Sequence, residues 1–122
     1  MRKACLIAAV VAALTLAASP ARAFGVNFRW CGGSPEFQLS GVPKGTATLD
    51  FRMTDLMAPS YPHGGGSIAY SGQSSVPCGA LSSYRGPSPP PPQIHTYRWT
   101  IKALDASGKT LGQATSERKF PE

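Results

Sequence analysis

Charged side chains and long apolar runs are both scarce in this chain, and their scarcity excludes several classes of protein. Only 15% of the 122 residues are charged, and the basic ones are scattered, which argues against a nucleic-acid-binding surface. After Leu16 no run approaches the roughly 20 apolar residues of a membrane-spanning helix, so we expect no transmembrane segment. No apolar period of 3.6 residues is sustained, which excludes a helical fold. The sequence also lacks the Gly-x-Ser-x-Gly elbow of lipase-like hydrolases, and no Gly-Lys-Ser/Thr follows the glycines at 64–66 to make a phosphate loop.

The first 23 residues have the features of a secretory signal peptide. Arg2 and Lys3 precede an apolar run from Leu6 to Leu16, and Ala21-Arg22-Ala23 is a small-x-small cleavage site. We therefore expect a periplasmic or secreted mature chain that forms a single domain of residues 24–122. Its nine Lys and Arg against six Asp and Glu give a net charge of +3, which favours anionic ligands only slightly.

Removal of the signal would leave two cysteines, Cys31 and Cys78, in a compartment where thiols are normally oxidised. We expect the two to form a disulfide. In the loop-entropy model this closure would stabilise the fold by about 4 kcal/mol. The alternative is a pair of unpaired, buried thiols.

Apolar and polar side chains alternate along most of residues 24–122, which predicts β-strands. The alternation covers residues 24–30, 36–40, 47–54 and 96–103, and a further strand is indicated around Ile68 and Tyr70, between a bend at glycines 64–66 and a turn at 72–75. The sequence Asp105-Ala106-Ser107-Gly108 predicts a hairpin turn into a last strand at 110–120, with glycine at a positive-φ position. The fold class is therefore all-β with little helix, and we expect an antiparallel two-sheet β-sandwich of six to eight strands.

Two polar residues fall in phase with the apolar faces of these strands. Asp55 closes the strand at 47–54, and His95 opens the strand at 96–103. If the two strands are antiparallel neighbours, the carboxylate and the imidazole meet at one edge, where they could bind a small polar head group, with a pH dependence if the imidazole titrates. Alternatively, Asp55 only caps the turn at 56–59 and His95 hydrogen-bonds a backbone carbonyl.

Several motifs, taken together, resemble the phosphatidylethanolamine-binding protein family, and in particular its bacterial, Raf-kinase-inhibitor-like branch. The motifs are Phe37-Gln38-Leu39-Ser40-Gly41-Val42-Pro43, Asp55-Leu56-Met57-Ala58-Pro59, His63, Tyr84-Arg85-Gly86-Pro87-Ser88-Pro89-Pro90, His95-Thr96-Tyr97 and Ala103-Leu104-Asp105. The similarity extends over residues 35–105. It implies the β-sandwich type of that family.

The resemblance also implies an anion-binding pocket, in which backbone and imidazole donors receive a phosphate-like group. The positions that match the family's pocket are Asp55, His63, Gly86, Pro87, His95 and Tyr97. The chain departs from the family at Met57, where a second aspartate is usual, and at Gly64, where a tryptophan is usual, and it ends soon after Asp105. His63 could instead lie on a flexible glycine-rich loop and face solvent. Asp55, His63 and His95 are chemically able to hold zinc, but their separation in sequence does not establish a site, and we expect no metal and no cofactor.

We therefore expect a non-enzymatic binding module for a small anionic or phosphate-bearing ligand beside His95. The alternative is a structural or protein-interaction domain, for example one that resembles a protease inhibitor, in which the pocket is vestigial. The proline run at 89–92 is expected to form a rigid pocket wall rather than a polyproline ligand.

Overall fold

The computed structural model describes residues 22–122, and within them every regular element is a strand. The expectation of an all-β fold is confirmed. Of the predicted signal peptide, residues 1–21 lie outside the described residues. No helix in the described part of the chain is long and apolar enough to cross a membrane.

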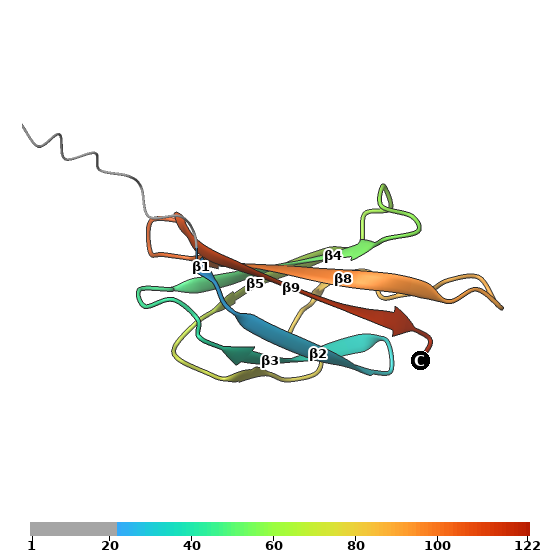
Figure 1. The fold of residues 1–122 in the computed structure, drawn as a ribbon, viewed down its shortest axis with the longest axis horizontal. Coiled ribbons are helices and arrows are strands. Elements are labelled where there is room, and N and C mark those ends of the chain that lie inside the picture. The colour runs from blue at the N-terminus through green and yellow to red at the C-terminus, as the bar shows by residue number, and fades with distance from the viewer. Residues whose placement is uncertain (1–21) are drawn as a thin grey trace, which may run out of the picture.

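The strands form two sheets, which lie one above the other in Figure 1. The larger sheet has the order β1-β9-β8-β4-β5-β7, and the smaller has the order β2-β3-β6. All neighbours are antiparallel except β1 and β9. The larger sheet comprises β1 (Arg22–Ala23), β4 (Thr48–Asp55), β5 (Gly64–Ala69), β7 (Ser83–Tyr84), β8 (His95–Leu104) and β9 (Thr110–Phe120). The smaller comprises β2 (Gly25–Cys31), β3 (Ser34–Ser40) and β6 (Ser75–Val76).

The described residues therefore contain nine strands rather than the expected six to eight. The difference comes from β1, β6 and β7, each of which has two residues and is too short to show alternation in the sequence. The six longer strands correspond to the predicted ones. The hairpin between β8 and β9 is also as predicted, with Gly108 at a φ of 86°.

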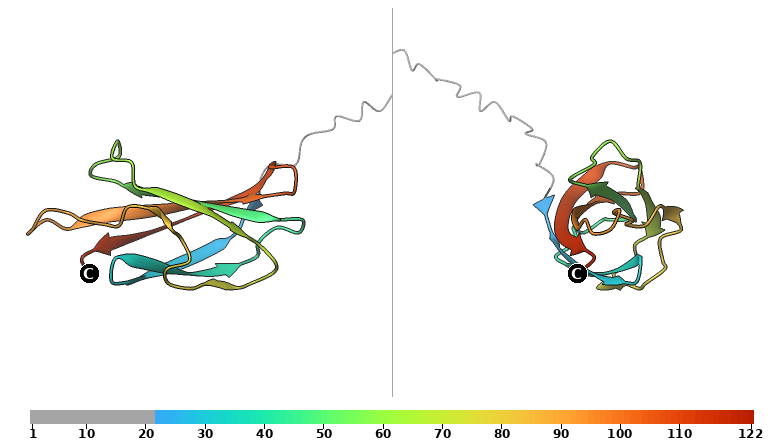
Figure 2. Two further views of the ribbon diagram at one scale, coloured as in Figure 1. Left: turned by 180° about the vertical axis from the view of Figure 1, so that it is seen from behind. Right: turned by 90° about the vertical axis from the view of Figure 1, so that its right-hand side faces the viewer.

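The core lies between the two sheets and is rich in aromatic rings. The ring of Phe37 from the smaller sheet lies 4.9 Å from Phe51 and 5.2 Å from Trp99 of the larger one. Trp30 of β2 contacts Phe120 of β9 at 5.3 Å. The end-on view in Figure 2 shows the two sheets curving around this interior. The two-residue period places Phe37, Phe51 and Trp99 inside, whereas Trp30 and Phe120 are partly buried and pack against this core.

The glycines at 64–66 were expected to form a bend before a strand, and this expectation is wrong. They are themselves residues of β5, which begins at Gly64. A Cβ on Gly65 would lie 1.6 Å from the carbonyl oxygen of Phe51, so β4 and β5 approach too closely at this point for any side chain. Gly64 has a φ of +74°, and a Cβ there would lie 2.8 Å from the carbonyl oxygen of Ser83. A tryptophan, usual in the family that the sequence resembles, has no room at position 64.

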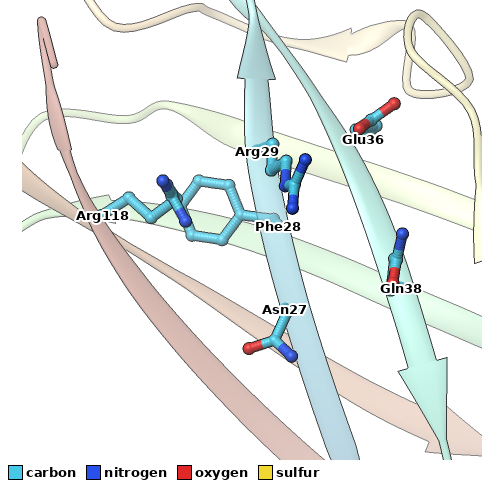
Figure 3. Close-up of a pocket in the computed structure, with 6 residues that line it drawn as sticks. All are labelled: Asn27, Phe28, Arg29, Glu36, Gln38 and Arg118. Atoms are coloured by element: carbon cyan, nitrogen blue, oxygen red, sulfur yellow. The ribbon is translucent and has the colours of Figure 1, made fainter.

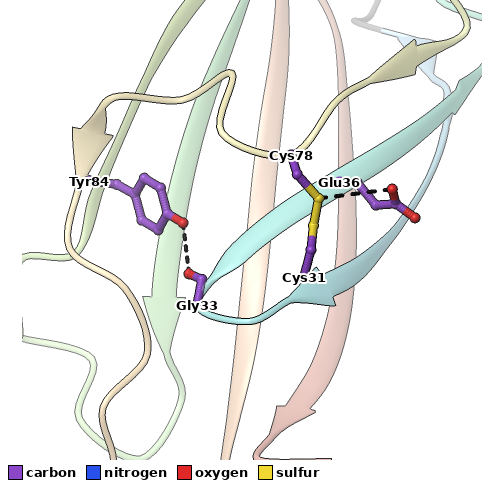
Figure 4. The surroundings of a disulfide bond; sticks show 5 residues. All are labelled: Cys31, Gly33, Glu36, Cys78 and Tyr84. Carbon is purple, nitrogen blue, oxygen red and sulfur yellow. Dashed lines mark hydrogen bonds between the residues drawn. A yellow bond between two sulfur atoms is a disulfide. The ribbon is translucent and has the colours of Figure 1, made fainter.

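The two cysteines of residues 24–122 lie together as predicted. Cys31, at the end of β2, and Cys78, just after β6, have their sulfurs at bonding distance and their Cα atoms 6.4 Å apart. Close to this disulfide the Tyr84 hydroxyl donates to the Gly33 carbonyl at 2.8 Å, as Figure 4 shows. The turn between β2 and β3 is thereby fastened to the segment that leads from β6 into β7.

Candidate functional site

The candidate site is a pocket at the ends of β4 and β8, where Asp55 and His95 lie. It has a volume of about 240 Å³. Among the residues that the structure describes, the buried polar or charged ones are Asp55 and His63, each 4% exposed, and both line this pocket. Buried polar side chains are costly unless they are paired or used, so their convergence marks the candidate site. The lining residues are Asp55, Ala58, Tyr61, His63, Gly86, Ser88, Pro89, Pro90, His95 and Tyr97.

Asp55 and His95 meet because β4 and β8 are antiparallel neighbours. The register pairs Asp55 with Tyr97. His95 lies two residues before Tyr97 on β8, so its side chain is on the same face of the sheet as those of Asp55 and Tyr97. The Leu56 N–H donates to the Thr96 carbonyl at 2.9 Å and extends the pairing past the end of β4. As a result the His95 Nδ1 lies 2.6 Å from the Asp55 Oδ2.

Asp55 has two roles that the sequence analysis treated as alternatives. Its Oδ1 accepts the backbone N–H of Met57 at 2.9 Å and so caps the following turn, while its Oδ2 faces His95. Burial alone would raise the pKa of Asp55. The hydrogen bonds from His95 and from the N–H groups of Met57 and Ala58 outweigh burial, and the pKa lies below its usual 3.8. The carboxylate is therefore ionised at neutral pH and accepts a hydrogen bond from the His95 ring.

His63 is buried, which rules out the alternative of a solvent-facing loop. Its position follows from a reciprocal contact: the Arg85 N–H donates to the His63 carbonyl at 2.7 Å, and the His63 Nδ1 lies 2.8 Å from the Arg85 carbonyl. A carbonyl can only accept, so Nδ1 carries the proton and Nε2 is the nitrogen available to a ligand.

Tyr97 lies between the two histidines. Its ring centre is 5.5 Å from that of His63 and 6.3 Å from that of His95. Burial, and after it the negative charge of Asp55, raises the pKa of Tyr97 above its usual 10.0, and a backbone hydrogen bond from Ser88 opposes the change. Tyr97 thus stays a neutral hydroxyl next to the Asp55 carboxylate and forms the floor between the imidazoles.

The remaining predicted residues come from the segment between β7 and β8. Gly86 lines the pocket, whereas Pro87 is buried next to it and does not line it. A Cβ on Gly86 would lie 3.2 Å from the Gly33 carbonyl, so the segment runs tightly against the turn between β2 and β3. The structure therefore brings five of the six predicted residues into one pocket and places the sixth behind its wall.

Sequence reasoning missed several residues at this site, among them Ala58, which lines the pocket. Tyr61 stacks on His63 with ring centres 4.5 Å apart, Ser88 and Tyr61 both line the pocket, and Gln93 places its Oε1 2.8 Å from the His95 Nε2. Ser88 and Gln93 lie within or next to the proline-rich segment, whose path no periodicity predicts. The one sequence signal at or near these two residues was the motif Tyr84-Arg85-Gly86-Pro87-Ser88-Pro89-Pro90.

A second hollow, of about 180 Å³, lies on the outside of the smaller sheet and is shown in Figure 3. It is lined by Asn27, Phe28, Arg29, Glu36, Gln38 and Arg118. Apart from Phe28, these side chains belong to partly or fully exposed residues, and Arg118 is engaged with Glu122. No buried titratable group faces this hollow, so we do not assign the functional site to it.

The described residues offer one close group of three potential metal ligands, Cys31, Glu36 and Cys78. Its two sulfurs are joined to each other, as Figure 4 shows, and a disulfide sulfur is not a thiolate ligand. Asp55, His63 and His95 do not form such a group within the described part of the chain. The geometry gives no support to the zinc site considered from the sequence.

Comparison with known proteins adds no family to these observations. No protein-family model matches the chain, and no curated protein matches it.

Proposed function

We propose that this chain is a non-enzymatic binding module that takes a small anion or a phosphorylated head group in the pocket beside His95. The single observation that carries the proposal is the convergence of the two buried polar residues, Asp55 and His63, on one pocket with His95 and Tyr97. A pocket of about 240 Å³ suits a group of phosphate size rather than a large organic ligand. A histidine ring that carries both protons, and backbone N–H groups at the edge of the pocket, can donate to anionic oxygens.

We also propose that the fold is of the phosphatidylethanolamine-binding type and that the mature protein is periplasmic or secreted. The order of the motifs and the two packed sheets support the first point. The predicted signal peptide and the pairing of Cys31 with Cys78 support the second, since disulfides persist mainly outside the cytoplasm.

The test is a shift titration by heteronuclear NMR with phosphate, phosphoethanolamine and acetate. Binding is expected to move the resonances of His95, His63 and Gly86. A His95→Ala variant is expected to lose this response while it keeps a folded spectrum, and Thr100→Ala, on the outer face of β8, serves as the matched control. Unchanged spectra at millimolar ligand would contradict the proposal.

A second candidate function, a protein-interaction domain, is favoured by one specific observation. The large hydrophobic residues that are exposed in the described part of the chain are Met57 at 65%, Tyr61 at 47% and Ile94 at 53%. Tyr61 lines the pocket, and Met57 and Ile94 are close in sequence to two of its lining residues, Asp55 and His95. Exposed apolar residues grouped at one place are typical of interaction surfaces.

Charged substitutions at this apolar rim separate the two functions. If the rim binds a protein, Met57→Lys and Ile94→Lys are expected to abolish association with a partner that the unsubstituted chain binds, whereas Thr100→Lys on the outer face leaves it intact. Retained phosphate binding in both rim variants, together with no effect on any partner, would favour the anion-binding module.

A further inference from the structure

The outer nitrogen of His95 is already occupied by a side chain of the same protein. His95 Nε2 lies 2.8 Å from Gln93 Oε1, and Nδ1 lies 2.6 Å from Asp55 Oδ2. The imidazole is thus held between two oxygen acceptors, a carboxylate on the inside and an amide on the solvent side. A ring protonated on both nitrogens donates to both partners.

The Gln93 side chain is free to leave, although its backbone is fixed. Its N–H donates to the Pro90 carbonyl at 2.9 Å, which closes a turn at the end of the proline run. The residue is exposed, and its contact with His95 also lies at the surface. Rotation about its side-chain bonds would transfer the amide to water without moving the backbone.

We propose that Gln93 is a displaceable cap on His95 Nε2, and that a ligand oxygen must take the place of Gln93 Oε1 to bind. This inference rests on the proposed function. It adds that Gln93 sets a threshold for binding, because a ligand must bind His95 more strongly than Gln93 does. A neutral ligand oxygen only replaces one neutral acceptor with another. On a ring that carries both protons, an anionic oxygen adds to this bond the attraction between opposite charges, which the neutral amide oxygen lacks, so an anion displaces the cap where a neutral ligand does not.

Opposite substitutions at Gln93 test the cap. Gln93→Ala removes the competitor, and since one net hydrogen bond contributes about 0.5–1.5 kcal/mol, inorganic phosphate is expected to bind roughly 2- to 10-fold more tightly. Gln93→Glu supplies a charged competitor, and phosphate is expected to bind about fivefold more weakly or worse. Gln113→Ala, at an exposed glutamine of β9 away from the pocket, is expected to leave the phosphate affinity unchanged.

Acetate and acetamide provide a matched pair of probes with nearly the same shape and different charge. Acetate is expected to bind the unsubstituted protein, and acetamide is expected to give no response. With the cap removed in Gln93→Ala, acetamide binding is expected to become measurable. If acetamide binds the two proteins equally well, Gln93 sets no threshold and the inference is overturned.

A measurement without ligand completes the experiment. The ring-nitrogen resonances of His95 are expected to differ between the unsubstituted protein and Gln93→Ala and to be unchanged in Gln113→Ala. Identical resonances in all three would show that the contact is absent in solution, which overturns the inference.

The outcomes separate failure of this inference from failure of the proposed function. If phosphate binds and His95→Ala abolishes binding, but both Gln93 variants match the unsubstituted protein, the cap is wrong and the anion-binding function stands. If phosphate binds neither the unsubstituted protein nor Gln93→Ala, both the function and the cap are wrong.

Discussion

Replacement of Asp55 tests whether its carboxylate organises the pocket, because two contacts of this one side chain can be assigned separate magnitudes. The bond to His95 involves a charged group and is worth about 1.5–3 kcal/mol, and the bond from the Met57 N–H is worth about 1 kcal/mol. Asp55→Ala loses both and is expected to lower the free energy of unfolding by about 3 kcal/mol. Asp55→Asn keeps an acceptor for Met57 but loses the charge, and a loss of about 1.5 kcal/mol is expected.

The pH dependence of this stability has a definite sign. The pKa of Asp55 is lower in the folded protein than its usual 3.8, so its contribution is fully present above 3.8 and is lost as the pH falls through the lower, folded value. The difference in stability between the unsubstituted protein and Asp55→Asn is therefore expected to shrink as the pH falls below 3.8.

Urea unfolding at a series of pH values, followed by tryptophan fluorescence, measures this difference. Asp50→Asn is the matched control, since Asp50 lies on the same strand but on the outer face, where its Oδ1 accepts only the exposed hydroxyl of Ser67. Equal stability of Asp55→Asn and the unsubstituted protein near pH 7 would refute the reasoning. So would a difference between them that grows as the pH falls.

Two further predictions concern the scaffold around the site. The double replacement of Cys31 and Cys78 by serine is expected to lower the free energy of unfolding by about 4 kcal/mol, measured by urea unfolding, and an effect well below 1 kcal/mol would mean that the loop-entropy argument fails for this bond. Gly65→Ala is expected to force β4 and β5 apart and to abolish cooperative unfolding, because its Cβ would lie 1.6 Å from the Phe51 carbonyl oxygen. Gly33→Ala, whose Cβ would meet nothing within 4 Å, is the control, and equal melting temperatures of the two variants would contradict the prediction.

The part of the site that lies on regular strands could be predicted from the sequence. Asp55 and His95 fall at the ends of two alternating segments, and the antiparallel pairing of β4 with β8 turns this phase into a contact of 2.6 Å. Alternation fixes the face on which a side chain lies, and only the pairing of strands was left open. The sequence could not state that pairing, because it joins residues 40 positions apart.

The part of the site that lies outside regular strands could not be predicted in the same way. Gly64 and Gly65 were interpreted as a bend, because glycine usually disfavours strands and nothing in the sequence reveals that Phe51 and Ser83 approach their backbones. No periodicity predicts the role of Gln93, since that role depends on a turn that closes on Pro90. Such contacts depend on the three-dimensional path of the segment between β7 and β8.

The physical reason why this segment can nevertheless hold a pocket is that it is anchored at both ends. At one end the Tyr84 hydroxyl donates a hydrogen bond to the Gly33 carbonyl, and the Arg85 backbone exchanges hydrogen bonds with His63. At the other end the segment enters β8 at His95, where the ladder to β9 begins. The turn that contains Gly33 is itself held by the disulfide of Cys31, as Figure 4 shows. Fixed ends and a proline-rich middle leave little conformational entropy to lose on binding, so the mobile element at the pocket mouth is a side chain, Gln93, rather than the backbone.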